Sequence, residues 1–429
     1  MSTSRRDVLK MAGVALAGST LPTFAILNPN RAFAGVNADT LKVGLIGCGG
    51  RGSGAANQAL KADPNVVLWA MGDIFKDKMD ASLENLTKVH GPKVKVDEGR
   101  KFIGFDAFKK VLDSGVDVVL LATPPHFRPE HLTAAINAGK HVFCEKPVAV
   151  DAPGVRKVLD AAKLAKQKNV SLMSGFCWRY HEPKRASFAR ILDGAVGDIT
   201  AIYNTYDTGT LWSFPRVSGW TDAEYVLRNW TYYTWLAGDH IVEQAVHSID
   251  MMAWAMGGKL PVSAVGTGGR QVRTDSLFGN IFDHFSVVYD YDNGVKGFHH
   301  SRQQANCENS YLVQTLGTKG SAMVNCARNV HEITGANPWK YDGPQNDMYQ
   351  TEHNELFASI RSGKLINDGE FMAHSTLTAI MGRMASYTGK RVTWNEALNS
   401  TEKLGPDTYS FDMKPPVVEV AKPGITAFS

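Results

Sequence analysis

Short apolar runs alternate with amphipathic stretches along the chain between residues 41 and 175. Each run ends at a glycine or a polar residue, and the runs cover 41–46, 66–71, 116–122, 141–144 and 171–174. The stretches between them include 130–138 and 155–166, where the spacing of apolar residues suits a helix. Short apolar strands separated by helices predict a doubly wound parallel sheet of the α/β class.

Beyond about residue 180 the pattern changes to strands joined by short turns. The strands predicted there are 264–268, 282–291, 295–302 and 311–316. The tripeptide Asp292-Asn293-Gly294 lies between two of them and is a strong hairpin signal. We therefore predict a second, α+β domain with a mostly antiparallel sheet, followed by helices at 352–361 and 371–387.

A glycine-rich turn follows the first predicted strand and opens a helix. Gly47 permits the tight turn, Gly49 lets the backbone approach a pyrophosphate, and Gly52 permits close packing of helix on strand. With Gly50 and Arg51 these residues form a G-x-G-x-x-G turn, whose helix N-terminus faces the anion. The pattern predicts a Rossmann domain that binds a dinucleotide; the alternative is an ordinary βα turn with incidental glycines.

Asp73 ends the second predicted strand, 21 residues beyond Gly52. An acidic residue at this place binds the adenosine ribose hydroxyls and repels a 2′-phosphate. This position favours NAD over NADP as the cofactor. Lys76 and Lys78 follow closely and keep NADP possible.

Several polar residues follow directly after the predicted strands, where the carboxyl ends of a parallel sheet gather ligands. The candidates at this edge are Gly47, Asp73, Thr123, Pro124, His126, Glu145 and Lys146. A lysine beside a cationic nicotinamide has a lowered pKa and can hydrogen-bond a substrate hydroxyl. Lys146 is therefore a candidate catalytic residue, with an ordinary surface lysine as the alternative.

A second catalytic candidate lies in the segment 238–250. If this segment is helical, Glu243 and His247 are spaced i,i+4 and share one face with His240 and Asp250. An imidazole beside a carboxylate is a competent general base near neutral pH. A structural histidine–carboxylate pair is one alternative and a metal site another, but no clear third ligand exists, and we expect no metal.

These motifs occur together in one order along the chain. The G-x-G-x-x-G turn, Thr123-Pro124, Glu145-Lys146-Pro147, Gly175-Phe176 with Arg179-Tyr180, and the acid-x₃-His-x₂-Asp pattern resemble the glucose–fructose oxidoreductase / inositol dehydrogenase (Gfo/Idh/MocA) family over residues 41–395. The resemblance implies an open-faced antiparallel sheet, an NAD(P) cofactor, a sugar or cyclitol substrate and a homo-oligomer, either a dimer or a tetramer.

The resemblance also implies a role for each motif residue. Lys146 would orient and polarise the substrate hydroxyl, and His247 would take its proton. Glu243 replaces the usual aspartate, so it either orients His247 or contacts substrate. The segment Trp178-Arg179-Tyr180 would lead from the cofactor to the substrate, although core packing is the alternative for Trp178.

An aromatic run at 229–235 precedes the candidate helix. Aromatic faces stack on the apolar faces of pyranose rings, which favours Trp230 and Tyr233 as substrate contacts. Aromatic clusters also fill cores and subunit interfaces, and that alternative stays open.

The first 34 residues have the composition of an export signal. Ser4-Arg5-Arg6 precedes an apolar stretch at 11–27, and Ala32-Phe33-Ala34 suits a signal peptidase. The segment resembles a bacterial twin-arginine signal with Val8 in place of phenylalanine, so we expect a periplasmic protein. A disordered tail and a retained anchor are the alternatives. No other apolar run is long enough to span a membrane.

Charge and cysteine content narrow the class of partner. The net charge is +4, and residues 1–34 carry four basic residues against one acidic residue, so the rest nets about +1. Such a surface does not favour nucleic acid, and a small molecule is the expected partner. The five cysteines form no C-x-x-C pair and indicate neither a disulfide framework nor a zinc site.

The chain is therefore expected to have four parts, namely a signal at 1–34, a nucleotide domain at 35–178, a substrate and oligomerisation domain at 179–400 and a tail at 401–429. The leading hypothesis is an oxidoreductase that moves hydride between a sugar, glycoside or cyclitol and a tightly bound nicotinamide. Tight binding follows from export, because the periplasm has no free NAD pool. The alternatives are an NAD-dependent glycosidase that works by transient oxidation and elimination, and a non-catalytic dinucleotide-binding protein.

Overall fold

The computed structural model describes residues 39–416 and 419–427 of the chain. The predicted signal at 1–34 lies outside the described residues. Within the part that is described, no helix is both long and apolar enough to cross a membrane.

The first sheet has six parallel strands in the order β3-β2-β1-β4-β5-β6. They are β1 (Leu41–Ile46), β2 (Val66–Asp73), β3 (Lys101–Ile103), β4 (Val118–Leu121), β5 (His141–Cys144) and β6 (Leu172–Ser174). Five of these strands coincide with the apolar runs, so the strands predicted from those runs are confirmed. The sequence misses β3, because an edge strand of three residues leaves no periodic signal.

Helices connect these strands, as a parallel sheet requires. They are α2 (Gly50–Ala62), α3 (Lys76–His90), α4 (Ala107–Asp113), α5 (Arg128–Asn137) and α6 (Ala152–Gln167). The helix predicted at 155–166 starts earlier, because the Asp151 side chain accepts a hydrogen bond from Gly154 N at 2.8 Å and caps the helix.

The second sheet has nine strands in the order β14-β13-β12-β11-β7-β10-β9-β8-β15. They are β7 (Ile199–Thr208), β8 (Ser263–Gly269), β9 (His284–Asp290), β10 (Lys296–Gln303), β11 (Leu312–Gly317), β12 (Gly320–Asn325), β13 (Val330–Gly335), β14 (Trp339–Lys340) and β15 (Val392–Thr393). Only β7 and β10 pair in parallel. The predicted mostly antiparallel sheet is confirmed, and Asp292–Gly294 forms the β9–β10 turn with Gly294 at φ +83°.

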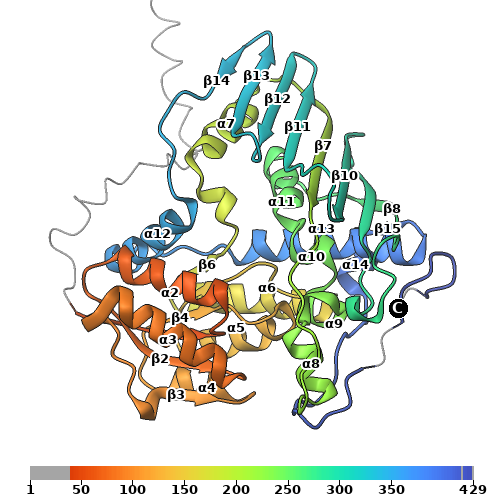
Figure 1. Ribbon diagram of the computed structural model, residues 1–429. Coiled ribbons are helices and arrows are strands. Elements are labelled where there is room, and N and C mark those ends of the chain that lie inside the picture. Colours follow the sequence, from red (N-terminus) through yellow and green to blue (C-terminus); the bar gives the residue numbers. More distant parts are fainter. Residues whose placement is uncertain (1–38, 417–418, 428–429) are drawn as a thin grey trace, which may run out of the picture. The chain divides into compact units, whose positions relative to one another are not determined.

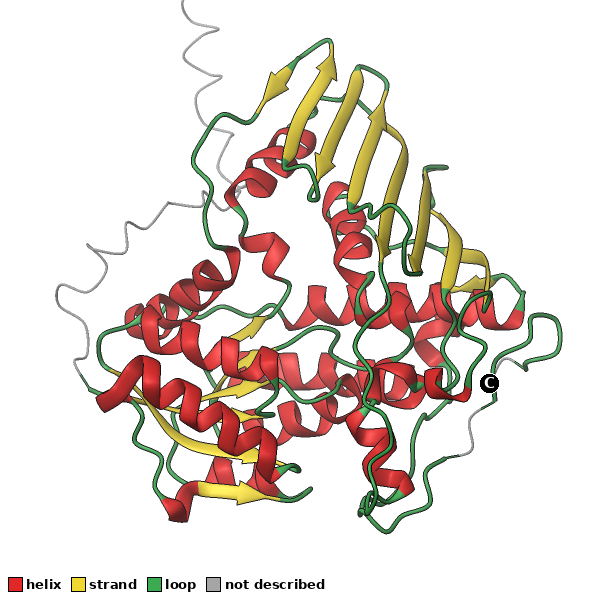
Figure 2. Ribbon diagram, viewed as in Figure 1, coloured by secondary structure: helices red, strands yellow, loops and turns green. Residues whose placement is uncertain are grey.

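Helices cover one face of this sheet (Figures 1 and 2). They are α7 (Glu182–Leu192), α11 (Val246–Ala255) and α13 (Gly369–Thr388), which contact strands of the second sheet. On the other face Phe298 and Leu316 are 42% and 37% exposed. The open-faced sheet that the family resemblance implies is therefore present.

Two helices from the second half of the chain pack against helices that flank the first sheet. Helix α12 (Met348–Ser362) packs on α2, and α13 packs on α6 as well as on β8. Arg361 donates from Nε to Asp63 Oδ2 at 2.7 Å, which ties the end of α12 to the end of α2. The nucleotide-binding half is thus completed by residues far beyond position 178.

The segment 238–250 is not one helix. It contains α10 (His240–Glu243) and the start of α11, with Gln244 and Ala245 between them. Asp239 precedes α10 with φ 72°, and its side chain accepts a hydrogen bond from His240 N. The break places Glu243 and His247 on two different helices, so the predicted shared helical face is wrong.

Candidate active site

The glycine turn fits a pyrophosphate. Gly47 has φ +94°, and a Cβ on Gly52 would lie 1.8 Å from the Gly47 carbonyl oxygen, so only glycine fits there. A Cβ on Gly49 or Gly50 would meet nothing within 4 Å, and these two residues leave open space beside the helix N-terminus. No side chain caps α2, so its first amides are available to an anion.

Asp73 is fixed at the end of β2 by the same turn. Its carboxylate accepts hydrogen bonds from Cys48 N at 2.6 Å and from Phe75 N at 2.8 Å. Burial raises the pKa of Asp73, while these backbone donors oppose that change. The carboxylate is therefore held at the edge where the adenosine ribose of a dinucleotide lies.

Arg51 and Glu145 form an ion pair across this edge. Arg51 Nε lies 2.8 Å from Glu145 Oε1, and Glu145 is buried. The Arg51 guanidinium also lies 4.7 Å from the centre of the Tyr349 ring on α12. Arg51 and Glu145 were both predicted to bind the cofactor. The structure brings these two side chains together between the glycine turn and β5.

The Lys146 side chain lies in the first half of the chain and contacts a residue of the second half. Its Nζ donates to the backbone oxygen of Glu243 at 2.7 Å and lies 3.2 Å from Glu243 Oε1. Both side chains are 15% exposed. Glu243 thus pairs with Lys146, and among the described residues no hydrogen bond joins it to His247.

His247 is a buried imidazole whose Nδ1 has no hydrogen-bond partner in the structure. Burial, and then the charges of Lys146 and Lys184, lower its pKa well below the usual range. The Trp178 ring stacks on it with centroids 5.0 Å apart and an interplanar angle of 29°. The ring is therefore neutral at neutral pH, and packing against Trp178 holds it in one orientation.

Arg179 and Tyr180 are held by residues of the second half. Arg179 donates to both Asp250 oxygens at 2.8 and 2.9 Å, and Ser375 Oγ adds a 2.7 Å hydrogen bond to the same carboxylate. Tyr180 OH donates to Asp368 Oδ2 at 2.8 Å. In this arrangement both side chains join the two halves, and their predicted contacts with cofactor or substrate stay predictions.

The loop after β4 is packed against later parts of the chain. Thr123 Oγ1 lies 3.3 Å from His131 Nδ1, and Pro124 leads into the short η3 turn (Pro125–Phe127). His126 Nε2 lies 2.7 Å from the hydroxyl of Tyr409, and burial lowers the His126 pKa to about 4. His126 is therefore neutral, and the described structure has it bonded to the C-terminal tail.

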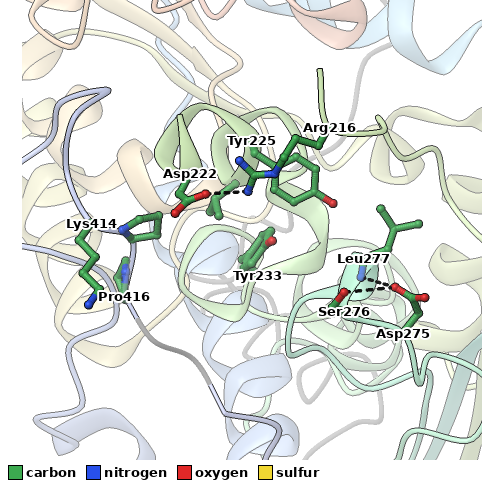
Figure 3. Close-up of a pocket in the computed structure, with 11 residues that line it drawn as sticks. Arg216, Asp222, Tyr225, Tyr233, Asp275, Ser276, Leu277, Lys414 and Pro416 are labelled. Carbon is green, nitrogen blue, oxygen red and sulfur yellow. Dashed lines mark hydrogen bonds and ion pairs between the residues drawn. The ribbon is translucent and has the colours of Figure 1, made fainter. Parts of the chain in front are cut away.

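Trp230 and Tyr233 have other neighbours than the candidate residues Lys146 and His247. Tyr233 lines a pocket of about 600 Å³ with Tyr225 and Arg216 (Figure 3), and Trp230 packs 6.4 Å from Trp212. In residues 39–416 and 419–427 neither ring forms a ring contact or hydrogen bond with Lys146 or His247. Packing thus accounts for Trp230, while sugar stacking by these rings stays a prediction.

Three residues at the site escape sequence reasoning. Tyr206 of β7 stacks on Trp178 with centroids 6.0 Å apart, and Tyr349 of α12 lies under Arg51. Glu352, also of α12, is fully buried, and neither of its carboxylate oxygens has a hydrogen-bond partner among the described residues. Burial raises its pKa well above the usual range. Alternation along β7 indicates which face Tyr206 occupies, but no sequence signal indicates its neighbour.

The arrangement of potential metal ligands and the state of the cysteine thiols bear on the chemistry of this site. Among the described residues no group of three His, Cys, Asp or Glu side chains is arranged to hold a metal ion. The five cysteines are free thiols, and burial raises the pKa of the Cys144 thiol, which lies next to Glu145, to about 12. This thiol is therefore protonated and unreactive at neutral pH.

The fold and this edge define a two-part, NAD-binding oxidoreductase architecture. A family model for the oxidoreductase family with an NAD-binding Rossmann fold matches residues 41–176, and a GFO/IDH/MocA C-terminal domain model matches 185–323. Together the two matches cover more than half of the chain, which belongs to the GFO/IDH/MocA family of oxidoreductases. The cofactor of its Rossmann domain is NAD.

Named relatives are sugar and cyclitol enzymes. The chain is 24% identical over 322 residues to inositol 2-dehydrogenase of Rhizobium meliloti, covering 75% of this chain and 86% of that protein. It is 27% identical over 312 residues to levoglucosan dehydrogenase of Pseudarthrobacter phenanthrenivorans, covering 67% and 74%. A solved aldose-aldose oxidoreductase from Caulobacter crescentus shares the fold with a TM-score of 0.66 at 18% identity, covering 82% and 99%.

Proposed function

We propose that the protein oxidises a ring hydroxyl of a sugar, glycoside or cyclitol, with Lys146 and His247 as the residues that handle the hydroxyl proton. One observation carries the proposal. The Lys146 ammonium is held at 2.7 Å by the backbone oxygen of Glu243, four residues before the buried imidazole of His247, whose pKa is lowered by burial and by the Lys146 charge. An ammonium group can hydrogen-bond the oxygen of an alcohol, and a neutral imidazole can accept its proton.

Each residue has a distinct task. Glu243 holds the Lys146 ammonium in place, and that ammonium donates a hydrogen bond to the substrate oxygen. His247 accepts the hydroxyl proton as the C=O bond forms. When bound, NAD would supply the hydride acceptor for the same carbon. The Trp178 ring stacks on the imidazole and the Phe176 ring meets it edge-on, at 5.0 and 5.9 Å between centroids, and these contacts fix its orientation.

We further propose that the protein is exported and keeps its cofactor. The support is the signal-like segment at 1–34, together with the lack of a free NAD pool outside the cytoplasm. Retention requires nanomolar affinity, about −12 kcal/mol. A retained cofactor must return to its starting redox state, either by reduction of a second sugar or within one catalytic cycle.

The first test quantifies dinucleotide released from the washed, denatured protein. We expect about one NAD(H) per chain. An empty protein that refuses added NAD would refute the oxidoreductase assignment. An empty protein that binds added NAD would leave the assignment intact and count against export with a resident cofactor.

A second candidate function is transient oxidation followed by elimination. It is favoured by similarity to a glycosyl hydrolase family 109 protein of Solibacter usitatus, at 29% identity over 54% of this chain, and to 2,7-anhydro-N-acetylneuraminate hydratase of Escherichia coli, at 24% over 49%. The two chemistries differ in their products. Glycoside cleavage without net NADH formation would establish elimination, whereas a stable keto sugar would establish oxidation.

A further inference from the structure

A separate hydrophobic cluster lies at the carboxyl ends of the first sheet. It joins loops that follow the strands to two later segments, residues 209–235 and 402–416, which we call the cover. Segment 209–235 leaves β7 as a long loop and contains α8 (Asp222–Arg228), η5 (Trp230–Tyr232) and the start of α9 (Thr234–Ala237) (Figure 1). The loops contribute Phe75, Phe105 and Phe127, which follow β2, β3 and β4.

Arg228 is a polar link between the cover and the first turn of α3, which follows β2 after two residues. Its guanidinium donates to both Asp77 oxygens at 3.0 Å and lies 4.0 Å from the centre of the Phe75 ring. Asp77 stands only four residues beyond Asp73. Arg228 is itself held by Glu224 at 2.9 Å, so the contact is made by a fixed side chain.

The tail forms the second half of the cover. Tyr409 is bonded to His126 at 2.7 Å, and its ring lies 5.2 Å from Phe127. Phe411 packs 5.7 Å from Phe75 and 5.5 Å from Phe105. The two parts are joined to each other, because Thr221 Oγ1 donates to the backbone oxygen of Phe411 at 2.5 Å.

We propose that the cover locks the loops after β2, β3 and β4 around the adenosine half of the dinucleotide and makes it a resident group that stays through many turnovers. This inference rests on the proposed function. A dinucleotide leaves only when those loops move apart. That movement exposes the aromatic cluster to water and breaks the Arg228–Asp77 pair, so release is slow. Arg228 is a positioning residue, since it acts through the start of α3 and the two residues that join it to Asp73 at the end of β2.

The experiment measures release of NADH from the full-length protein. Protein loaded with NADH is mixed with a large excess of NAD, and the fall in bound NADH fluorescence gives the release rate. We expect Arg228→Ala to release NADH about tenfold faster, the effect of removing an ion pair and a cation–π contact together. The matched control is Arg216→Ala. This arginine also belongs to the cover and pairs with Asp222 at 2.8 Å, but it faces the pocket of Figure 3.

Two further variants keep the test decisive if Arg228→Ala does not fold. Asp77→Asn removes the other half of the pair at a side chain that is 59% exposed, and Asp80→Asn on the same helix is its control, since Asp80 pairs only with Lys76 in the described structure. We expect Asp77→Asn alone to speed release. Tyr409→Phe removes the hydrogen bond to His126 and should also speed it.

The outcomes separate the two proposals. Equal release rates for the wild type, Asp77→Asn and Tyr409→Phe would overturn the cover while leaving NAD binding and the proposed function intact. A protein that binds neither NAD nor NADH would refute the proposed function itself. Fast release in Arg216→Ala as well would show that the cover acts only through general stability, which also overturns the specific role of Arg228.

Discussion

Lys146 Nζ lies 2.7 Å from the backbone oxygen of Glu243, although 97 positions separate the two residues. The lysine belongs to the loop after β5 and the glutamate ends α10, so the contact joins the two halves of the chain at the candidate active site. We expect Glu243→Gln to weaken the hold on the ammonium and lower turnover by about tenfold, the scale of one charge-assisted hydrogen bond. Measurement of kcat and KM should show the loss mainly in kcat. An unchanged kcat would show that the Glu243 carboxylate does not support the Lys146 ammonium during catalysis.

His247→Ala should lower turnover by about 10² to 10⁴ while leaving NAD bound, because general base catalysis contributes on that scale. Steady-state kinetics and a separate NAD titration test the two parts. Phe176→Leu removes one ring that packs on the imidazole but keeps the base, so it should lower turnover less than His247→Ala does. Loss of NAD binding in His247→Ala would place this residue at the cofactor and refute its role as base.

Substitutions at two glycines of the same turn should differ in their effect on stability. Gly52→Ala places a Cβ 1.8 Å from the Gly47 oxygen, so the variant should lose several kcal/mol of stability and its NAD binding. Gly49→Ala meets no protein atom within 4 Å and should keep its melting temperature, yet weaken NAD binding by crowding the pyrophosphate. Thermal unfolding and NAD titration of both variants provide the check. Equal NAD affinity in Gly49→Ala and the wild type would contradict this position for the phosphates.

Asp250→Ala should destabilise the protein strongly. The carboxylate is buried and accepts hydrogen bonds from Arg179 and Ser375. Its removal leaves the largely buried Arg179 guanidinium without its ion-pair partner, which should lower the free energy of unfolding by about 3 kcal/mol. Urea unfolding should show this loss. The exposed pair Lys163–Asp160 is a suitable control, since Asp160→Ala is expected to change stability by less than about 0.5 kcal/mol.

Acid should loosen the contact between the tail and the first domain. Burial lowers the His126 pKa from 6.5 to about 4, so the folded state binds fewer protons than the unfolded state between these values. Above pH 6.5 the histidine is neutral in both states and costs no stability. As the pH falls from 6.5 to 4, protonation of the unfolded state lowers the free energy of unfolding by about 3 kcal/mol. Unfolding of the wild type and His126→Gln across this range should show a shallower slope for the variant. Parallel slopes would contradict the neutral, buried His126.

The sequence was sufficient to predict the strands, the hairpin and the glycine turn. Apolar runs of the right length predicted five of the six parallel strands, and Asn293-Gly294 predicted the β9–β10 hairpin. The glycine turn predicted the start of α2, because a helix that packs this closely on a strand accepts only glycine at position 52. These features depend on residues near one another in the chain, so their signals are local.

Contacts between distant residues were decided only by the tertiary structure. An i,i+4 spacing suggested that Glu243 supports His247, but a break between α10 and α11 turns Glu243 to Lys146 instead. No local pattern places Tyr206 against Trp178, or the tail residue Tyr409 against His126. The sequence by itself determined which residue types stand at the ends of the strands. Which of them meet was decided by packing of the two halves, because a side chain's partner across a fold leaves no periodic trace in the chain.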